Sequence, residues 1–202
     1  MTELPPGWAE TILGEIADTS LGKMLDRGRA TGEHLVPYLR NVNVQWGRID
    51  VDDVLTMDIS PEEQSFFRLE PGDLLVCEGG EIGRCAIWPG QPGYMAFQKA
   101  LHRVRPRKGI EAKYLRFLME HMSLAGLLVS YSTGSTIKHL PQQRLRRITL
   151  HLPPTAEQRR IVAVLEDQLS NFAHGSSALD KAILRTAFLK RAIADEVASH
   201  CP

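Results

Sequence analysis

The sequence is divided at Leu152-Pro153-Pro154-Thr155-Ala156-Glu157-Gln158-Arg159-Arg160-Ile161. The two prolines should end the secondary structure that precedes them, because proline fixes its own φ angle and donates no backbone hydrogen bond. A helical pattern opens directly after them, with Thr155 suited to the N-cap and Gln158 three residues later, the spacing of a reciprocal capping box. The sequence therefore predicts a compact domain over residues 1–153 and a helical arm over residues 154–202.

The arm repeats apolar residues at spacings of three and four, which is the pattern of a coiled-coil seam. The seam positions that we expect to pair are Val162, Leu165, Leu169, Phe172, Leu179, Ile183 and Ile193. A helix over residues 155–197 would span roughly 60 Å, too long to bury both of its sides on one small domain. We therefore expect it to pair with a partner chain or a second helix. The alternative is that it folds back at Gly175 onto its own domain.

The domain before the arm mixes many short strands with few helices. Extended patterns predict strands over residues 8–13, 34–40, 74–77, 84–88, 98–106 and 146–152, and apolar spacing predicts a helix over residues 110–130. Pro37 places its strand at a sheet edge or a bulge. Strands and helices do not alternate regularly, which argues against a doubly wound sheet. We expect an α/β domain of α+β type with short mixed strands, followed by the long coiled-coil helix.

Composition is that of an ordinary soluble globular protein, with 43% hydrophobic and 24% charged residues among 202. No apolar run approaches the roughly 20 residues that span a membrane, and the N-terminus lacks the basic and apolar regions of a signal peptide. The three cysteines form no CxxC pair. We therefore expect reduced thiols, a cytoplasmic location, no membrane partner and no disulfide or zinc framework.

Charge is distributed unevenly although the net charge is zero. Residues 1–97 carry 7 basic and 16 acidic side chains, residues 98–154 carry 11 basic and 2 acidic ones, and the remainder carries 6 of each. A segment as basic as 98–154 could present a positive face to a polyanion such as nucleic acid. The alternative, that the two halves neutralise each other across the fold, stays open.

The sequence contains no motif typical of catalysis. Glu78-Gly79-Gly80-Glu81-Ile82-Gly83 matches neither G-x-G-x-x-G nor a P-loop, and a strand follows it, so a hairpin is favoured over a phosphate site. The histidines form neither an H-x-x-x-H nor an H-E-x-x-H pair, and no serine stands in G-x-S-x-G. We expect no enzymatic activity, no metal site and no cofactor.

Three groups of polar residues are suited to nucleic acid. Arginine reads guanine and asparagine or glutamine reads adenine through paired hydrogen bonds, and the chain offers these types at Arg40, Asn41, Asn43, Gln45 and Arg48. Arg103 and Arg105 lie two apart and share a strand face, which we expect in water or on nucleic acid, together with Lys99. A polar hairpin rim is the alternative for the first group.

The third group is a loop rich in hydroxyl groups and glycine, which supply donors for phosphate oxygens. Its members are Ser132, Thr133, Gly134, Ser135, Thr136 and Lys138. Arg27 and Arg29, on the polar segment 21–33, complete the predicted DNA-binding set. The alternative for the loop is a flexible connector.

Taken together, these features resemble the DNA specificity subunit of type I restriction–modification systems. The stretches that carry the resemblance are Leu4-Pro5-Pro6-Gly7-Trp8 with 13–16, Tyr38-Leu39-Arg40-Asn41-Val42-Asn43 with 47–50, 71–75 through Gly83-Arg84-Cys85-Ala86, 98–105, Ser132-Thr133-Gly134-Ser135-Thr136, and Leu152-Pro153-Pro154 with 157–162. No single stretch is specific, but the ordered set covers nearly the whole chain.

The resemblance implies a target recognition domain that reads one half of a bipartite site in double-stranded DNA. The helix would act as a spacer and would dock the methyltransferase subunit, with the restriction subunit joining through the complex. Methyl transfer from S-adenosylmethionine would belong to the partner, so this subunit would be non-catalytic and need no cofactor.

The family usually carries two domain–helix units in tandem, whereas this sequence carries one. We therefore expect a half-subunit that forms a homodimer through antiparallel helices and reads a palindromic split site. A truncated or degenerate gene product is the alternative. Two other classes also remain, a protein-interaction adaptor whose helix docks partners without reading DNA, and an unrecognised hydrolase with a convergent pocket.

Overall fold

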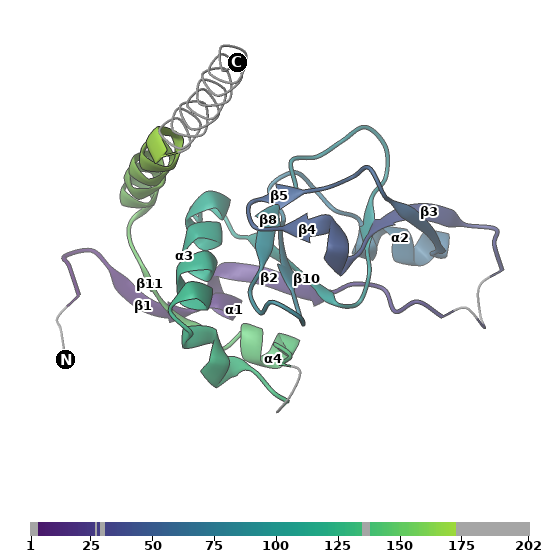
Figure 1. Ribbon diagram of the computed structural model, residues 1–202, viewed down its shortest axis with the longest axis horizontal. Helices are drawn as coiled ribbons and strands as arrows, with labels where there is room; N and C mark the ends of the chain where they lie inside the picture. Colours follow the sequence, from purple (N-terminus) through teal and green to yellow (C-terminus); the bar gives the residue numbers. More distant parts are fainter. Residues whose placement is uncertain (1–3, 27, 29–30, 135–137, 173–202) are drawn as a thin grey trace, which may run out of the picture. The chain divides into compact units, whose positions relative to one another are not determined.

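The computed structural model describes residues 4–26, 28, 31–134 and 138–172 (Figure 1). The chain divides into two compact units, Met1–Arg159 and Arg160–Pro202. The boundary predicted from the two prolines, between residues 153 and 154, lies six residues earlier. The first turn of the helix therefore belongs to the first unit, and its side-chain contacts explain why.

An antiparallel four-stranded sheet forms the centre of the first unit (Figure 1). Its strands, in the order in which they pair, are β2 (Ala17–Leu21), β10 (Leu101–Pro106), β7 (Leu74–Cys77) and β8 (Cys85–Ile87). Every residue of β7 is buried, as its unbroken apolar run predicts. Leu75, Cys77 and Leu101 of this sheet belong to a hydrophobic core cluster, so this sheet anchors the loops at its ends.

A second, three-stranded sheet combines β6 (Leu55–Asp58), β3 (Leu35–Leu39) and β9 (Ala96–Phe97) in that order. The prediction that Pro37 marks an edge strand or a bulge is wrong, because β3 is the central strand. Strand β9 pairs in parallel only with Tyr38 and Leu39, and Pro37 lies just outside that short ladder, opposite Thr56 of β6. The missing N–H of proline therefore leaves no gap in the pairing with β9.

Two short antiparallel pairs complete the strands. β1 (Ala9–Ile12) pairs with β11 (Thr149–Leu152), which ties the beginning of the domain to its end. β4 (Val44–Gln45) pairs with β5 (Arg48–Ile49) in a small hairpin.

Helices lie between the strands and are mostly short: α1 (Leu13–Ile16), the 3-10 turn η1 (Asn41–Asn43), α2 (Pro61–Phe67), α3 (Ala112–Leu124), the 3-10 turn η2 (Leu127–Tyr131) and α4 (Gln142–Leu145). The helix predicted over residues 110–130 is divided into α3 and η2. Gly126 causes the division, because its φ of +70° ends the α-helical path and glycine adopts it without strain. The mixed strand and helix composition of the predicted fold is confirmed.

The joint between domain and helix does not use the predicted capping box. The Glu157 and Gln158 amides both donate to the Pro154 carbonyl, so Pro154 occupies the N-cap position. The Thr155 hydroxyl donates instead to the Gly109 carbonyl at 2.7 Å, and the Gln158 side chain is buried. The capping-box prediction is wrong because both side chains find partners in the loop that precedes α3.

Helical structure continues over residues 160–172 of the second unit. Of the predicted seam, Val162 is 8% exposed, whereas Leu165, Leu169 and Phe172 are 37%, 52% and 73% exposed. Leu179, Ile183 and Ile193 lie outside the described residues. Among the helices that the structure describes, none has the length and apolar character needed to cross a membrane.

Candidate nucleic-acid interface

Four loop segments from distant parts of the sequence meet at one end of the four-stranded sheet. β2 and β7 end there and β10 and β8 begin there, because the four strands are antiparallel. The segments are 22–26, 98–100, 78–83 and 132–140, the last described at 132–134 and 138–140, and we call their described residues together the loop ridge. Loops held by a rigid sheet are a common location for binding residues.

Backbone contacts join the four segments of the loop ridge. Lys23 and Gln98 form a parallel bridge, and the Glu78 amide donates to the Ala100 carbonyl at 2.9 Å. Gly79 and His139 form an antiparallel bridge, next to the Leu140 amide, which donates to the Glu78 carbonyl at 2.7 Å. The segments therefore form one continuous surface element.

Two backbone features hold the turn of residues 98–101 close to its neighbours. A Cβ at Gly22 would lie 2.4 Å from the Phe97 carbonyl oxygen, so no other residue fits there. Ala100 has a φ of 120°, which strains a residue with a side chain by about 1–3 kcal/mol. Strain of this kind persists only where the surroundings impose it, and the turn leaves the Lys99 side chain exposed.

His102 lies beneath the loop ridge in β10 and is fully buried. Its Nε2 is 2.7 Å from the Leu140 carbonyl oxygen, and since a carbonyl only accepts, Nε2 carries the proton. Burial lowers the pKa of His102, an effect that the Leu140 carbonyl and the charge of Glu78 oppose only in part. A neutral imidazole therefore ties β10 to the 132–140 segment.

Side chains from η1 and the β4–β5 hairpin hold the 78–83 segment. Arg84 donates to the Asn41 side-chain oxygen at 2.6 Å, and the Asn41 amide nitrogen donates to the Gly79 carbonyl at 3.2 Å. Trp46 donates its indole N–H to Glu81 at 2.7 Å. The hairpin predicted between β7 and β8 is confirmed, and Asn41, predicted to read bases, contacts its first turn.

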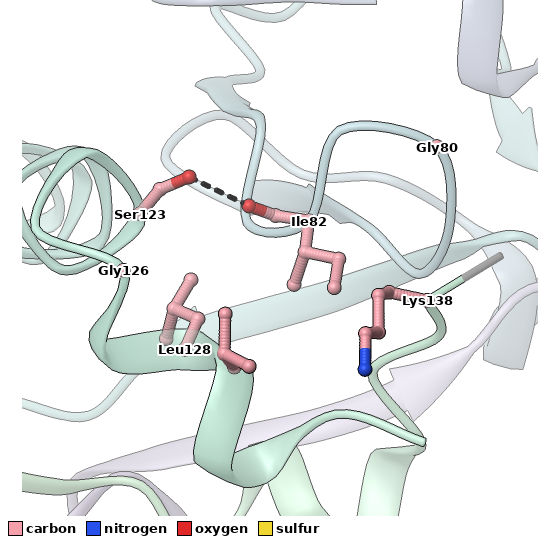
Figure 2. A pocket seen from close by; sticks show the side chains of 7 residues that line it. Gly80, Ile82, Ser123, Gly126, Leu128 and Lys138 are labelled. Carbon is pink, nitrogen blue, oxygen red and sulfur yellow. Dashed lines mark hydrogen bonds between the residues drawn. The ribbon is translucent and has the colours of Figure 1, made fainter. Parts of the chain in front are cut away.

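A surface cavity of about 470 Å³ lies between the 78–83 segment and η2. Its lining combines apolar side chains with one cation: Gly80, Ile82, Ser123, Gly126, Leu128, Val129 and Lys138. Figure 2 shows Lys138 beside Ile82, across the cavity from Leu128. The Ser123 hydroxyl donates to the Ile82 carbonyl at 2.8 Å and fixes that wall to α3.

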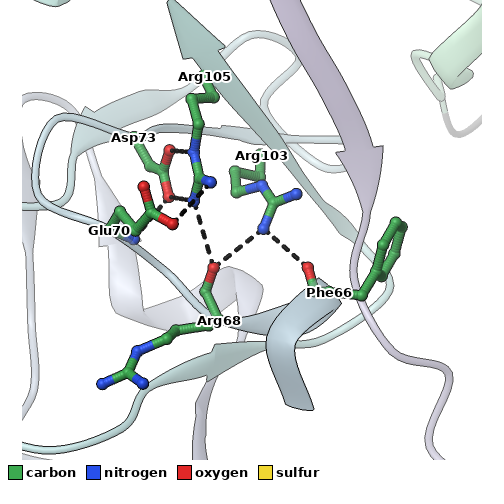
Figure 3. A network of polar contacts seen from close by, with 6 residues as sticks. All are labelled: Phe66, Arg68, Glu70, Asp73, Arg103 and Arg105. Carbon is green, nitrogen blue, oxygen red and sulfur yellow. Dashed lines mark hydrogen bonds and ion pairs between the residues drawn. The ribbon is translucent and has the colours of Figure 1, made fainter. Parts of the chain in front are cut away.

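Arg103 and Arg105 share one face of β10, as predicted, but that face packs against residues 66–73 instead of lying in water (Figure 3). Arg105 donates two hydrogen bonds, of 2.7 and 2.9 Å, to the carboxylate of Asp73, which is 1% exposed. Arg103 donates to the Phe66 and Arg68 carbonyls at 2.8 and 2.9 Å. The prediction of a solvated face is therefore wrong, because acidic and carbonyl partners lie opposite it.

The same pairing supports in part the alternative that the two halves of the chain neutralise each other. Besides Asp73, Arg105 contacts Glu70 at 2.9 Å, and Arg107 contacts Asp18 at 2.8 Å. These arginines come from the basic segment and their partners from the acidic one. The cations that remain on the loop ridge are Lys99 and Lys138, along with Lys23, which is paired with Glu63.

The predicted base-reading group is mostly engaged within the protein. Asn43 is 2% exposed, accepts from the Arg40 amide and donates to two carbonyls, so a base-reading role does not fit its burial. Arg40 binds Asp53 at 2.5 Å, and Gln45 donates to the Val42 carbonyl at 2.8 Å. Arg48 is exposed, with Asp50 at 3.8 Å. Most of this group therefore fits the alternative reading, a polar hairpin rim.

The predicted hydroxyl-rich loop lies on the loop ridge. Ser132 is 9% exposed and donates to the Val129 carbonyl, whereas Gly134 is exposed with a φ of +87°. Thr133 and His139 exchange two backbone bonds of 2.8 and 2.9 Å, which closes the loop on itself. Ser135, Thr136, Arg27 and Arg29 lie outside the described residues.

Sequence reasoning did not single out several residues that shape the ridge. Gly22 acts through close approach to Phe97 and Gln98, and His102 acts through burial and a bond to Leu140, 38 residues along the chain. Trp46 and Arg84 were also not predicted as site residues, although each lies beside a predicted motif. Over the described ranges, no group of three or more His, Cys, Asp or Glu side chains could hold a metal ion.

Comparison with known proteins gives a consistent picture. The chain is 28% identical over 172 residues to the putative type I restriction enzyme MjaX specificity subunit of Methanocaldococcus jannaschii, a match covering 82% of this chain and 40% of that protein. It is 23% identical over 188 residues to the StySPI specificity subunit of Salmonella potsdam, covering 89% and 40%. The chain therefore spans about two fifths of the length of these relatives.

Solved structures share the fold. A chain of a type I R-M system, from work on complex assembly and conformational transition, superposes with a TM-score of 0.74 at 22% identity, covering 96% of this chain and 46% of that one. The HsdS subunit of Thermoanaerobacter tengcongensis gives a TM-score of 0.64 at 22% identity, covering 85% and 40%. The family model of the type I restriction modification DNA specificity domain matches residues 5–177. The chain belongs to this family of type I DNA specificity domains.

Proposed function

We propose that this chain is a non-catalytic, sequence-specific DNA-recognition subunit that reads one half of a bipartite target with the loop ridge. The observation that carries the proposal is the gathering of four distant loop segments on one end of a rigid sheet. Exposed Lys99 and the cation of Lys138 supply charge for phosphates, while Thr133 and Gly134 supply a hydroxyl and an open backbone. Phosphate contacts position such a domain and contacts to base edges specify the sequence.

The chemistry of methylation and cleavage belongs, in this proposal, to separate subunits. The methyltransferase subunit docks on this chain and the restriction subunit joins through the complex. Two features support this division: the family is that of a DNA specificity domain, and the relatives are named specificity subunits.

A second copy of the chain supplies the second recognition domain in this proposal. The apolar side chains of Leu165, Leu169 and Phe172 are exposed on the helix and support the pairing of two copies. Pairing of two such helices in antiparallel orientation buries these positions. A two-fold axis between the copies then requires a palindromic target, because the same surface reads both halves.

DNA binding at the loop ridge is tested by charge reversal. Lys99→Glu and Lys138→Glu should each weaken binding to the target about tenfold and reduce the slope of log affinity against log salt by about one. The measurement is a salt titration of binding to duplex DNA by the full chain together with its methyltransferase subunit.

Lys108→Glu is the matched control, because Lys108 is exposed, as Lys99 is, but lies beyond the opposite end of β10. It should change the affinity much less than the two ridge variants. Equal losses in all three variants would show a general charge effect and would refute recognition by the loop ridge. Undiminished binding in both ridge variants would instead favour the adaptor alternative.

A further inference from the structure

The side chain of Gln158 is 1% exposed, although it belongs to the first turn of a helix with mostly exposed side chains. A buried amide is costly unless its donors and acceptor are satisfied. Gln158 meets this condition through three contacts, all within the first compact unit. Its presence in the interior therefore reflects a specific set of partners and not apolar packing.

The three contacts join two separate segments. The Gln158 side-chain nitrogen donates to the Pro153 carbonyl at 2.9 Å and, more weakly, to the Gly109 carbonyl at 3.4 Å. The side-chain oxygen accepts from the Glu111 amide at 2.9 Å. Glu111 is the N-cap residue of α3, so a single side chain links the start of α3 to the start of the C-terminal helix.

Two neighbours reinforce the link from the same turn. Thr155 donates its hydroxyl to the Gly109 carbonyl at 2.7 Å, and Arg159 donates to the Glu111 carboxylate at 2.6 Å. Gly109 adopts a φ of +89°, a backbone conformation that glycine reaches without strain. The turn of residues 109–111 thus receives hydrogen bonds from three side chains of residues 155–159.

We propose that Gln158 is a positioning residue that locks the first helical turn to the recognition domain and so sets the spacing between the two halves of the DNA target. The spacing part of this inference rests on the proposed function. Anchoring matters because a helix acts as a lever. Over the described residues 155–172 the helix is about 27 Å long, so a tilt of about 10° moves its far end by about 5 Å. That displacement exceeds the rise of about 3.4 Å for one base pair.

Three variants separate positioning from plain stability. Gln158→Met keeps the volume and removes all the hydrogen bonds, whereas Gln158→Glu keeps the acceptor for the Glu111 amide and loses the donors. Gln142→Met is the matched control, because Gln142 also donates its side-chain amide to a backbone carbonyl, that of Thr19 at 2.8 Å, away from the joint. Urea unfolding measures the stability that each variant loses, and the loss should be larger for Gln158→Met, because Gln142 is only half-buried and bonds to Thr19 alone.

The first readout needs no DNA. A fluorescent probe on Gln168→Cys, in a full-length chain that also carries Cys201→Ser, reports motion of the helix by anisotropy decay. Cys77 and Cys85 are buried and escape labelling. In Gln158→Met we expect the amplitude of the nanosecond decay to rise about twofold, while Gln142→Met leaves it unchanged. An unchanged decay in Gln158→Met would overturn the inference.

The second readout is binding to duplexes with a fixed pair of half-sites and spacers of varied length, in the complex with the methyltransferase subunit. Gln158→Met should reduce the preference for the best spacing over its neighbours roughly tenfold, about the worth of one net hydrogen bond, while binding to a single half-site stays the same. The spacing preference of Gln158→Glu should lie between those of the wild-type chain and Gln158→Met.

The possible outcomes are distinguishable. A sharp spacing preference in Gln158→Met, equal to that of Gln142→Met, would reduce Gln158 to a structural residue and overturn the inference. If the wild-type complex binds no split site, the proposed function fails, and the anisotropy decay alone then decides whether Gln158 anchors the helix.

Discussion

At the scale of single residues, His102 shows how one buried side chain supports a surface. It donates to the Leu140 carbonyl at 2.7 Å, and its other nitrogen, Nδ1, is buried with no hydrogen-bond partner in the described part of the chain. Protonation would place a charge at that second nitrogen in the interior. Because burial lowers the pKa of His102, the folded protein holds the neutral form more tightly than the unfolded chain does.

The free energy of unfolding should therefore decrease as the pH drops below the pKa of an ordinary histidine, about 6.5. In that range the unfolded chain binds a proton that the folded protein resists, so the free energy of unfolding decreases by at most about 1.4 kcal/mol for each pH unit. His102→Gln keeps a donor near the Leu140 carbonyl but cannot titrate. Urea unfolding at pH 7.5 and 5.5 should show a smaller acid-dependent loss in this variant. Equal losses would contradict a buried neutral His102.

Asn43 and Lys99 show why residue type alone did not define the interface. Both were predicted from their chemistry, yet Asn43 is 2% exposed with its amide engaged, while Lys99 is exposed on a strained turn. Asparagine satisfies backbone groups within a fold as well as it reads adenine. Only the surroundings decide between these roles.

At the scale of secondary-structure elements, the local patterns were good guides to strands and turns. The apolar run of β7 and the hairpin after it depend on residues close together in the chain. Predictions failed where a segment distant in the sequence packs against the element. Pairing with β9 makes β3 a central strand, and the Thr155 hydroxyl donates to the Gly109 carbonyl and not to its own helix.

The polar contacts of Figure 3 join β10 to the segment between α2 and β7. Arg105 contributes the hydrogen bonds to both acidic residues of that segment, Asp73 and Glu70. Arg105→Met should destabilise the domain by about 3 kcal/mol, because it leaves the Asp73 carboxylate buried without its charged partner. Urea unfolding measures the loss. The double variant Arg105→Met with Asp73→Asn should recover part of it, since the buried charge is then gone. A loss below about 1 kcal/mol in the single variant would contradict this role for the pair.

At the scale of the whole molecule, the chain divides into two compact units, and it spans about two fifths of the length of its relatives. In the proposed function, one copy of the chain reads one half of a split target and a second copy reads the other. The exposed apolar side chains of residues 165, 169 and 172 offer a surface for this pairing.

Sedimentation equilibrium of the full chain should show a dimer that Leu169→Glu converts to a monomer, because a carboxylate in the seam would be buried without a partner. Val164→Glu is the control, since Val164 is similarly exposed, at 49%, but lies off the three-four seam. A wild-type monomer at all concentrations, or equal effects of both variants, would refute pairing through this seam.

The sequence by itself determined the family resemblance and the mixed fold. These depend on short patterns whose meaning is set by residues within a few positions, such as the two prolines before Thr155. Only the tertiary structure decided which polar residues form the loop ridge and which hold the core. Burial and charge pairing are set by segments that meet in space, as Arg105 meets Asp73 and Gln158 meets Glu111.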